Sequence, residues 1–177
     1  FYAAASIVDT HPAIKASSPQ APIGDWFVGD DFHHNGAFNL QDGFRFFYNF
    51  DHVENTPTTA RREPIDFGSD DAYQFFLDLG PLKNANERYY HNTIPTWDSL
   101  MQHGTYDSYW QSRNIIPHMK NVTASVMTVA GLYDAEEPHG PIGIYHSTEA
   151  NNPGINNTLV LGPWFHGGWV RSTGAFL

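Results

Sequence analysis

The sequence contains no cysteine, and this absence excludes disulfides, thiolate catalysis and cysteine-based zinc sites. Basic residues are also few. There are 9 Lys and Arg against 19 Asp and Glu, so the net charge is −10 with histidine neutral. Nucleic acid is therefore not an expected partner, because phosphate binding needs a basic surface. No run of about 18 apolar residues occurs, and we expect no transmembrane helix.

The first residues lack the features of a protein start. The segment FYAAASIVD has neither an initial Met nor a charged leader, so no signal peptide is visible. Its composition is that of the middle of a helix. We therefore expect the sequence to be a piece of a longer protein, and its composition leaves the compartment open.

Aromatic residues are abundant. They make up 15% of the 177 residues, against an ordinary hydrophobic content of 41%. The length is enough for one domain with a sizeable core. The aromatic excess predicts a lined pocket or an aromatic-rich lid in addition to that core.

The C-terminal third alternates strand and helix patterns. Residues 122–129, VTASVMTV, are apolar and rich in β-branched side chains, which predicts a buried strand. A helix is predicted over 140–150 and a second short buried strand over 158–161. Near the start, 2–8 is predicted as a buried helix and 14–18 as a short core strand. The order strand, helix, strand is typical of a parallel sheet, so the predicted fold class is α/β.

The composition changes in the middle of the chain, over residues 40–109. Aromatic residues cluster there, and two segments, 70–79 and 96–114, have helical spacing. We predict that 40–109 is a mostly helical insertion. It would separate two parts of one α/β core, 1–39 and 110–177.

Two polar motifs follow the predicted strands of the C-terminal third. They are GLYDAEE, which contains Asp134, and GPWFHGG, which contains His166. Active sites of parallel sheets gather at the carboxyl ends of strands, and neighbouring strands lie about 4.8 Å apart. A carboxylate that orients a histidine, which then deprotonates a nucleophile, is the logic of a catalytic triad. The order acid then histidine fits an α/β-hydrolase whose serine lies upstream. Against this, a single Asp is usually a turn residue and a single His is usually a surface residue.

Three segments carry a resemblance to a known family: SPQAPIGDWFVGDDFHHNGAF, YDSYWQSRNIIPHMKNVTASVMTVAGLYDAEEPHGP and NTLVLGPWFHGGW. They resemble the α-amino acid ester hydrolase group, which includes glutaryl-7-aminocephalosporanic acid acylases. The group lies within the family of cocaine esterase and X-prolyl dipeptidyl peptidases. The resemblance implies a fragment of an α/β-hydrolase with an inserted helical cap. It also implies that the nucleophile elbow and a C-terminal jelly roll are absent from this chain.

The same resemblance implies the site residues. Asp134 and His166 fall on the triad acid and base. Asp31, Glu136 and Glu137 fall on a carboxylate cluster that binds the substrate's α-ammonium group. Glu137 departs from the Asp expected there. Several carboxylates facing one pocket repel one another, and a bound cation relieves that repulsion. The alternative is a solvated acidic loop, which is common in a protein of this charge.

The expected function is hydrolysis of esters or amides of α-amino acids, with β-lactam acyl side chains among the candidates. No cofactor and no metal are implied. A metal site at Asp30, Asp31, His33 and His34 is the weaker interpretation, because no HExxH spacing occurs. An X-prolyl peptidase, a general esterase and a non-catalytic ligand-binding α/β domain remain alternatives. The oligomeric state stays open, and the resemblance favours a periplasmic or secreted location.

Overall fold

The computed structural model describes residues 1–51, 56–60, 63–69 and 71–170. The chain divides into two compact units. Phe1–Ala37 together with the chain from Tyr106 onward form the first, which we name the α/β unit. Phe38–Thr105 form the second, which we name the helical unit. The sequence-based division put these boundaries at 40 and 109. That the helical unit acts as a cap over an active site stays a prediction.

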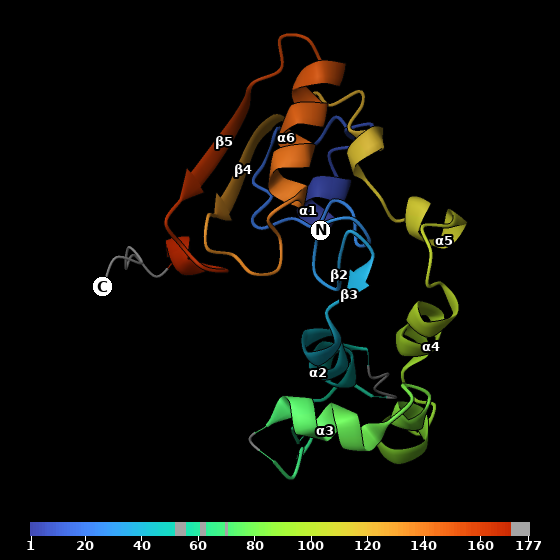
Figure 1. Ribbon diagram of the computed structural model, residues 1–177. Helices are drawn as coiled ribbons and strands as arrows, with labels where there is room; N and C mark the ends of the chain where they lie inside the picture. The colour runs from blue at the N-terminus through green and yellow to red at the C-terminus, as the bar shows by residue number, and fades with distance from the viewer. Residues whose placement is uncertain (52–55, 61–62, 70, 171–177) are drawn as a thin grey trace. The chain divides into compact units, whose positions relative to one another are not determined.

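The α/β unit contains a three-stranded parallel sheet (Figure 1). Its strands are β1 (Ala16–Ser17), β4 (Ser125–Gly131) and β5 (Asn157–Gly162), in the order β1-β4-β5. Strands β4 and β5 pair over six residues each, from Val126 opposite Asn157 to Gly131 opposite Gly162. This register puts the carboxyl ends of both strands at the same edge of the sheet. The α/β fold predicted from the sequence is confirmed.

Helix α6 (Gly140–Asn151) connects β4 to β5 and packs against both. Four shorter helical segments belong to the same unit: α1 (Tyr2–Ala5), α5 (Ser108–Gln111), η2 (Ile116–His118) and η3 (Gly168–Val170). The fully buried core joins α1, the segment after η2, β4 and α6, through the apolar side chains of Ala4, Ile7, Met119, Val122, Val126 and Ile144. Burying these side chains supplies the main driving force for folding of this unit.

Two predicted elements of the α/β unit differ from the structure by three residues at one end. The helix predicted over 2–8 is regular only at Tyr2–Ala5 and continues as turns, although Ile7 is still fully buried. The strand predicted from Val122 begins at Ser125 instead. The N–H of Val122 donates to the side chain of Asn152 rather than to a neighbouring strand. Apolar patterning locates buried segments well, but hydrogen-bond partners decide where a strand begins.

The helical unit consists of α2 (Leu40–Phe50), α3 (Ala72–Leu79), the π-helix η1 (Asn86–Tyr90) and α4 (Pro95–Gln102). Its core is aromatic. The ring of Phe44 is surrounded by six others, those of Phe67, Phe75, Phe76, Tyr89, Tyr90 and Trp97. The predicted helix over 96–114 is therefore two helices, α4 and α5, which belong to different units. Residue 70, the predicted start of α3, lies outside the described residues.

A short hairpin of β2 (His33–His34) and β3 (Ala37–Phe38) stands where the chain passes from one unit to the other. None of the helices in the described ranges combines the length and the apolar character that a membrane crossing requires.

Candidate functional site

The loops after β4 and β5 are held against each other by backbone hydrogen bonds. Leu132 N–H donates to the carbonyl of Gly162 at 2.8 Å, and Tyr133 N–H donates to that of Trp164 at 3.0 Å. Gly131 permits this approach, because a Cβ there would lie 2.0 Å from the Trp164 carbonyl oxygen. Any side chain larger than hydrogen at this position would push the loops apart.

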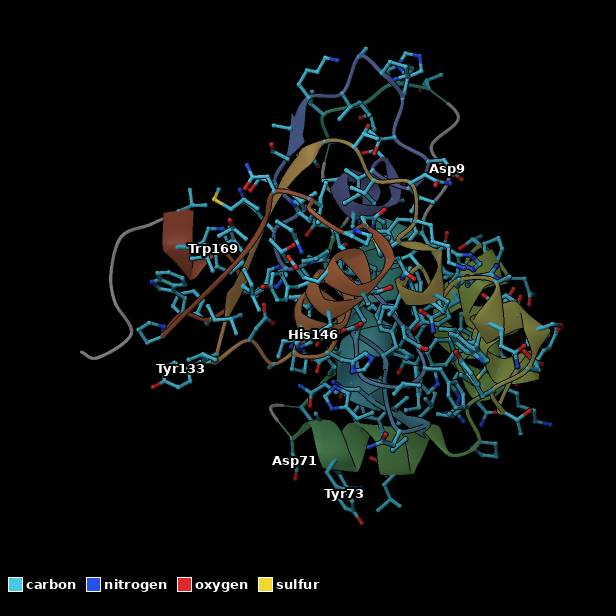
Figure 2. The ribbon with its side chains drawn as sticks, turned by 90° about the horizontal axis from the view of Figure 1, so that it is seen from above. Asp9, Asp71, Tyr73, Tyr133, His146 and Trp169 are labelled. Atoms are coloured by element: carbon cyan, nitrogen blue, oxygen red, sulfur yellow. The ribbon has the colours of Figure 1, made fainter. Side chains whose placement is uncertain are left out.

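The exposed rim of these loops is aromatic. Figure 2 shows Tyr133, from the loop after β4, and Trp169, from η3, at the same side of the α/β unit. The Trp169 ring lies 6.4 Å from the His166 ring, centroid to centroid. The indole N–H of Trp169 donates to the side chain of Gln20 at 2.8 Å, which fixes the ring. The two loops thus present an aromatic surface beside the histidine.

Asp134 lies at the centre of this site. Its side chain is fully buried, and its Oδ1 accepts the backbone N–H groups of Glu136 at 2.9 Å and Glu137 at 3.3 Å. These two bonds form a turn that fixes the orientation of the carboxylate. Oδ2 then faces Nδ1 of His166 at 2.9 Å. The predicted contact between the Asp134 carboxylate and the imidazole is present.

His166 presents about half of its side chain to solvent. An ionised carboxylate only accepts hydrogen bonds, so the Asp134 contact places a proton on Nδ1. In the neutral imidazole Nε2 is then the basic nitrogen. This tautomer is the one that a histidine needs in order to take a proton from a hydroxyl.

Two further carboxylates face the same Nδ1. Oε2 of Glu137 lies 2.8 Å away and Oε2 of Glu136 lies 3.8 Å away. The Glu137 oxygen is close but has no hydrogen-bond partner. The single Nδ1–H points to Asp134 instead, so we treat the Glu137 contact as an ion-pair contact. The Glu137 carboxylate raises the pKa of His166 to about 9 against the effect of burial, and Asp134 adds to the rise.

Asp31, from the loop before β2, is the fourth acidic residue near His166. It is buried, its backbone has a φ of +49°, and its N–H donates to the Glu136 carbonyl at 2.7 Å. Its carboxyl is hydrogen-bonded to that of Glu137. Burial first, and the neighbouring Glu137 second, raise the pKa of Asp31 to about 9. Asp31 therefore carries a proton at neutral pH, because two buried carboxylates in contact cannot both be ionised cheaply.

All five residues singled out from the sequence meet in one place. We name the group around His166 the carboxylate cluster, and its acidic members are Asp31, Asp134, Glu136 and Glu137. The roles of these residues in catalysis and substrate binding stay predictions. The sequence did not indicate that Glu137 would contact the imidazole directly. The one feature of the sequence that could have indicated this contact is the longer side chain of Glu137, where Asp is expected.

Asp30 has a different role from its neighbour. Its Oδ2 accepts the N–H groups of Gly24 and Asp25, and its Oδ1 accepts those of His139 and Gly140, at 2.7 to 3.2 Å. We name this arrangement the Asp30 clamp, since it joins the loop before β2 to the start of α6. Burial raises the pKa of Asp30, and the amide bonds act against that rise. Both oxygens are occupied, which argues against Asp30 as a metal ligand.

A metal ion is a second interpretation of the carboxylate cluster. Asp134, Glu136, Glu137 and His166 each offer a ligand atom, and these atoms lie within 4.8 Å of one another. Yet Nδ1 stands 2.8 to 2.9 Å from two of the carboxylate oxygens. Ligands around a tetrahedral zinc with bonds of about 2.0 Å would be about 3.3 Å apart. The distance from Nδ1 to these oxygens is that of a hydrogen bond, which argues against a metal ion between them.

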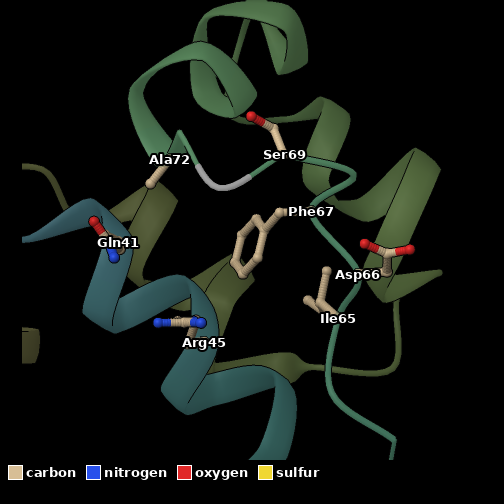
Figure 3. Close-up of a pocket in the computed structure, with 7 residues that line it drawn as sticks. All are labelled: Gln41, Arg45, Ile65, Asp66, Phe67, Ser69 and Ala72. Atoms are coloured by element: carbon tan, nitrogen blue, oxygen red, sulfur yellow. The ribbon is translucent and has the colours of Figure 1, made fainter.

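A separate pocket of about 340 Å³ lies within the helical unit (Figure 3). Arg45 of α2 lies over the Phe67 ring at 5.1 Å, and the other lining residues are Gln41, Ile65, Asp66, Ser69 and Ala72. Ser69 is the one hydroxyl among the described lining residues. No histidine is found among them, so this pocket offers no base to activate that serine.

Comparisons with known proteins identify the kind of chain this is. The model of the family described as X-Pro dipeptidyl-peptidase (S15 family) matches residues 1–168. The crystal structure of an aminopeptidase from the marine sediment archaeon Thaumarchaeota archaeon is 30% identical, with a TM-score of 0.77 over 93% of this chain and 26% of that chain. An α-amino acid ester hydrolase structure is 28% identical, with a TM-score of 0.80 over 94% of this chain and 27% of that chain. No curated protein matches. The chain thus spans about a quarter of the two solved structures.

Proposed function

The chain belongs to the X-Pro dipeptidyl-peptidase (S15) family, and from this premise we propose that the complete protein is a serine hydrolase for esters or amides of α-amino acids. The observation that carries the proposal is the 2.9 Å contact between Asp134 Oδ2 and His166 Nδ1. It lies at the carboxyl ends of two adjacent parallel strands, where α/β enzymes have their active sites.

In this proposal the reaction passes through an acyl-enzyme. A serine hydroxyl attacks the acyl carbon while Nε2 of His166 takes its proton, and the histidine then passes that proton to the leaving group. Asp134 holds the imidazole in the required tautomer. In the described part of the chain no hydrogen bond joins His166 to a serine, so we propose that the serine lies outside the described residues.

The carboxylate cluster supports a substrate with a free α-ammonium group. Asp31, Glu136 and Glu137 converge beside the base, and an ammonium ion would relieve the repulsion among them. The aminopeptidase and the α-amino acid ester hydrolase that this chain resembles have names that refer to substrates with an amino group. We propose that the cluster selects such substrates over their des-amino analogues.

A peptidase that cleaves after an X-Pro dipeptide is the second candidate. The name of the family supports it, and a peptide's N-terminal ammonium fits the same cluster. An X-Pro anilide and an α-amino ester distinguish the two candidates when their kcat/KM values on the full-length protein are compared. The larger value identifies the preferred class.

The test of the ammonium role uses Asp31→Asn and Glu136→Gln in the full-length protein. Each substitution should lower the ratio of kcat/KM for an α-amino ester to that for its des-amino analogue, because the ammonium group loses one carboxylate partner. We expect at least about tenfold at the buried Asp31, since truncating one partner of a buried charge pair costs about 2–5 kcal/mol. The loss should be smaller at Glu136, whose side chain is 51% exposed. Equal slowing of both substrates would mean that the carboxylates are structural, and the ammonium role would be dropped.

A further inference from the structure

The imidazole of His166 is contacted by two carboxylates where a triad needs one. Asp134 Oδ2 lies 2.9 Å and Glu137 Oε2 lies 2.8 Å from the same Nδ1. A ring nitrogen has one N–H, so only one of the two can receive a linear hydrogen bond. The Glu137 side chain is only 5% exposed, and its Oε2 is without a hydrogen-bond donor.

A second buried carboxylate at this distance favours the protonated imidazolium. The pKa of His166 is raised to about 9, with Glu137 as its largest cause. At pH 7 such a group is neutral in only about 1% of molecules. An imidazolium cannot accept a proton from a serine, so the contact with Glu137 opposes the role of His166 as a base.

The other titratable neighbours leave Glu137 as the group that decides this balance. Asp31 is protonated near neutrality and hydrogen-bonded to Glu137. Glu136 is half exposed and lies at 3.8 Å, so solvent screens its charge. Asp134 is the partner that the neutral imidazole keeps. Beyond these, the ring of Trp169 lies next to the imidazole, and it does not titrate.

We propose that Glu137 couples substrate recognition to catalysis: a bound α-ammonium group competes with His166 for the Glu137 carboxylate and so releases the imidazole to act as the base. This inference rests on the proposed function. It assigns Glu137 as a positioning residue. Substrates with an ammonium group should then both bind more tightly and react faster than their des-amino analogues.

The protons balance in this scheme. When the ammonium binds, the imidazolium loses its Nε2 proton to solvent. It keeps its Nδ1 proton, and Asp134 accepts the hydrogen bond that this N–H donates. The Nε2 lone pair then takes the serine proton as the bond from serine oxygen to acyl carbon forms. The leaving group later receives that proton as its bond to the acyl carbon breaks.

The first test measures the pH profile of kcat/KM for a des-amino ester on the full-length protein. The wild-type profile should rise with an apparent pKa near 9, since kcat/KM reports the free enzyme. Glu137→Gln should lower this pKa by more than about one unit and speed the des-amino reaction at pH 7 by about tenfold or more. Glu137→Asp, shorter by one methylene, should give an intermediate shift.

A matched control separates this effect from a simple loss of charge. Glu149, in the last turn of α6, is hydrogen-bonded to Asn157 at the start of β5, at the opposite end of the strands from His166. Glu149→Gln removes the same charge and should leave the pH profile within about 0.3 units of wild type. A shift as large as that of Glu137→Gln would overturn the specific role of Glu137.

The second test titrates His166 directly by NMR of the full-length protein labelled at histidine carbons. The probe is 2-phenylethylamine, a primary amine without an acyl group that stays protonated below about pH 9. Saturation with it should lower the pKa of His166 by more than about one unit in the wild type and by much less in Glu137→Gln. An unchanged pKa in the wild type overturns the inference, even where Glu137→Gln fails to fold.

The two proposals fail in distinguishable ways. If α-amino esters are preferred but the amine leaves the His166 titration unchanged, the coupling is wrong and the proposed function stands. If neither preference nor amine binding is found, the ammonium site itself is wrong, and the coupling fails with it.

Discussion

The Asp30 clamp and the carboxylate cluster contain consecutive aspartates in opposite surroundings. Both oxygens of Asp30 accept two backbone N–H groups each. The carboxyl of Asp31 faces Glu137 and the charges around His166. Both side chains are buried. One carboxylate is therefore supplied with donors by the fold, while the other is left among acceptors.

This difference separates a structural role from a chemical one. A buried carboxylate with four amide donors stabilises the loops that it joins, because its charge is distributed over hydrogen bonds. A buried group of carboxylates with too few donors costs stability, and such costs are typical of sites that bind or react. The same residue type, one position apart, therefore meets a structural environment at Asp30 and, in our proposal, a chemical one at Asp31.

The largest contrast is expected between activity and stability at the cluster. In the full-length protein His166→Ala should lower kcat by about 10³-fold or more, because the base is removed. Its Tm should change little above about pH 9, where the imidazole is neutral in the folded protein and no longer contributes to stability through its charge. Asp134→Asn should also lower kcat steeply, because its amide N–H₂ would donate to Nδ1 and force the wrong tautomer. Steady-state kinetics and calorimetry check both, and retention of most activity in His166→Ala would contradict the triad.

The reverse contrast is expected at the clamp. Asp30→Asn replaces one oxygen by an amide nitrogen, which leaves two backbone N–H groups without an acceptor. We expect the free energy of unfolding to fall by about 3 kcal/mol. Denaturant unfolding of the full-length protein measures this. A change below about 1 kcal/mol would mean that water replaces the lost acceptor and that the clamp is weaker than its geometry indicates.

The same substitution at the next residue should have the opposite sign. Asp31 keeps its proton in the folded protein until about pH 9 but loses it near pH 4 when unfolded, so the folded state binds more protons between these values. Unfolding free energy therefore falls as pH rises through this window. Asp31→Asn, which tolerates the positive φ, should stabilise the protein by roughly 1–2 kcal/mol at pH 8 and lower its activity on α-amino esters.

The pH profile of stability sharpens this prediction. The pKa of His166 is raised to about 9, above its unfolded value near 6.5. Its contribution is full below about pH 6.5 and is lost as pH rises to about 9. Unfolding curves from pH 6 to 9 should flatten in Asp31→Asn and flatten further when His166→Ala is added. An Asp31→Asn curve parallel to the wild type would refute the assignment of the titration to Asp31.

The smallest effect on stability is expected for Glu136→Gln. The Glu136 side chain is 51% exposed, and exposed charges contribute little to folding. We expect its unfolding free energy to stay within about 0.5 kcal/mol of wild type. A loss comparable to that of Asp30→Asn would show that Glu136 is part of the scaffold and remove the contrast between the two regions.

The sequence was sufficient for the parts that depend on local pattern. The run of β-branched residues before Gly131 and the run TLVL before Gly162 locate two strands. β4 is mostly buried as predicted, whereas the predicted burial of the second strand is wrong, because β5 is exposed or half-buried up to Gly162. The polar motifs after them place Asp134 and His166 at the same sheet edge. Parallel pairing of β4 with β5 then brings the two side chains into contact, because the carboxyl ends of neighbouring parallel strands lie side by side.

The split of the 96–114 segment and the surroundings of the buried acids could not be predicted in this way. Helical spacing does not indicate where a chain crosses between two compact units. Likewise, Asp30 and Asp31 are the same residue type, so the sequence does not distinguish their surroundings. Which one receives the amides of His139 and Gly140 depends on residues 109 and 110 positions away in the chain.

The sequence by itself determined the α/β fold and the placement of Asp134 and His166 after neighbouring strands, because apolar periodicity and strand-end placement are local properties. Only the tertiary structure decided that Glu137 meets Nδ1 of His166 at 2.8 Å and that Asp30 lies among amides while Asp31 lies among acids. The physical reason is that burial and charge–charge interactions depend on distances between segments remote in the chain, and those distances exist only once the loops have packed together.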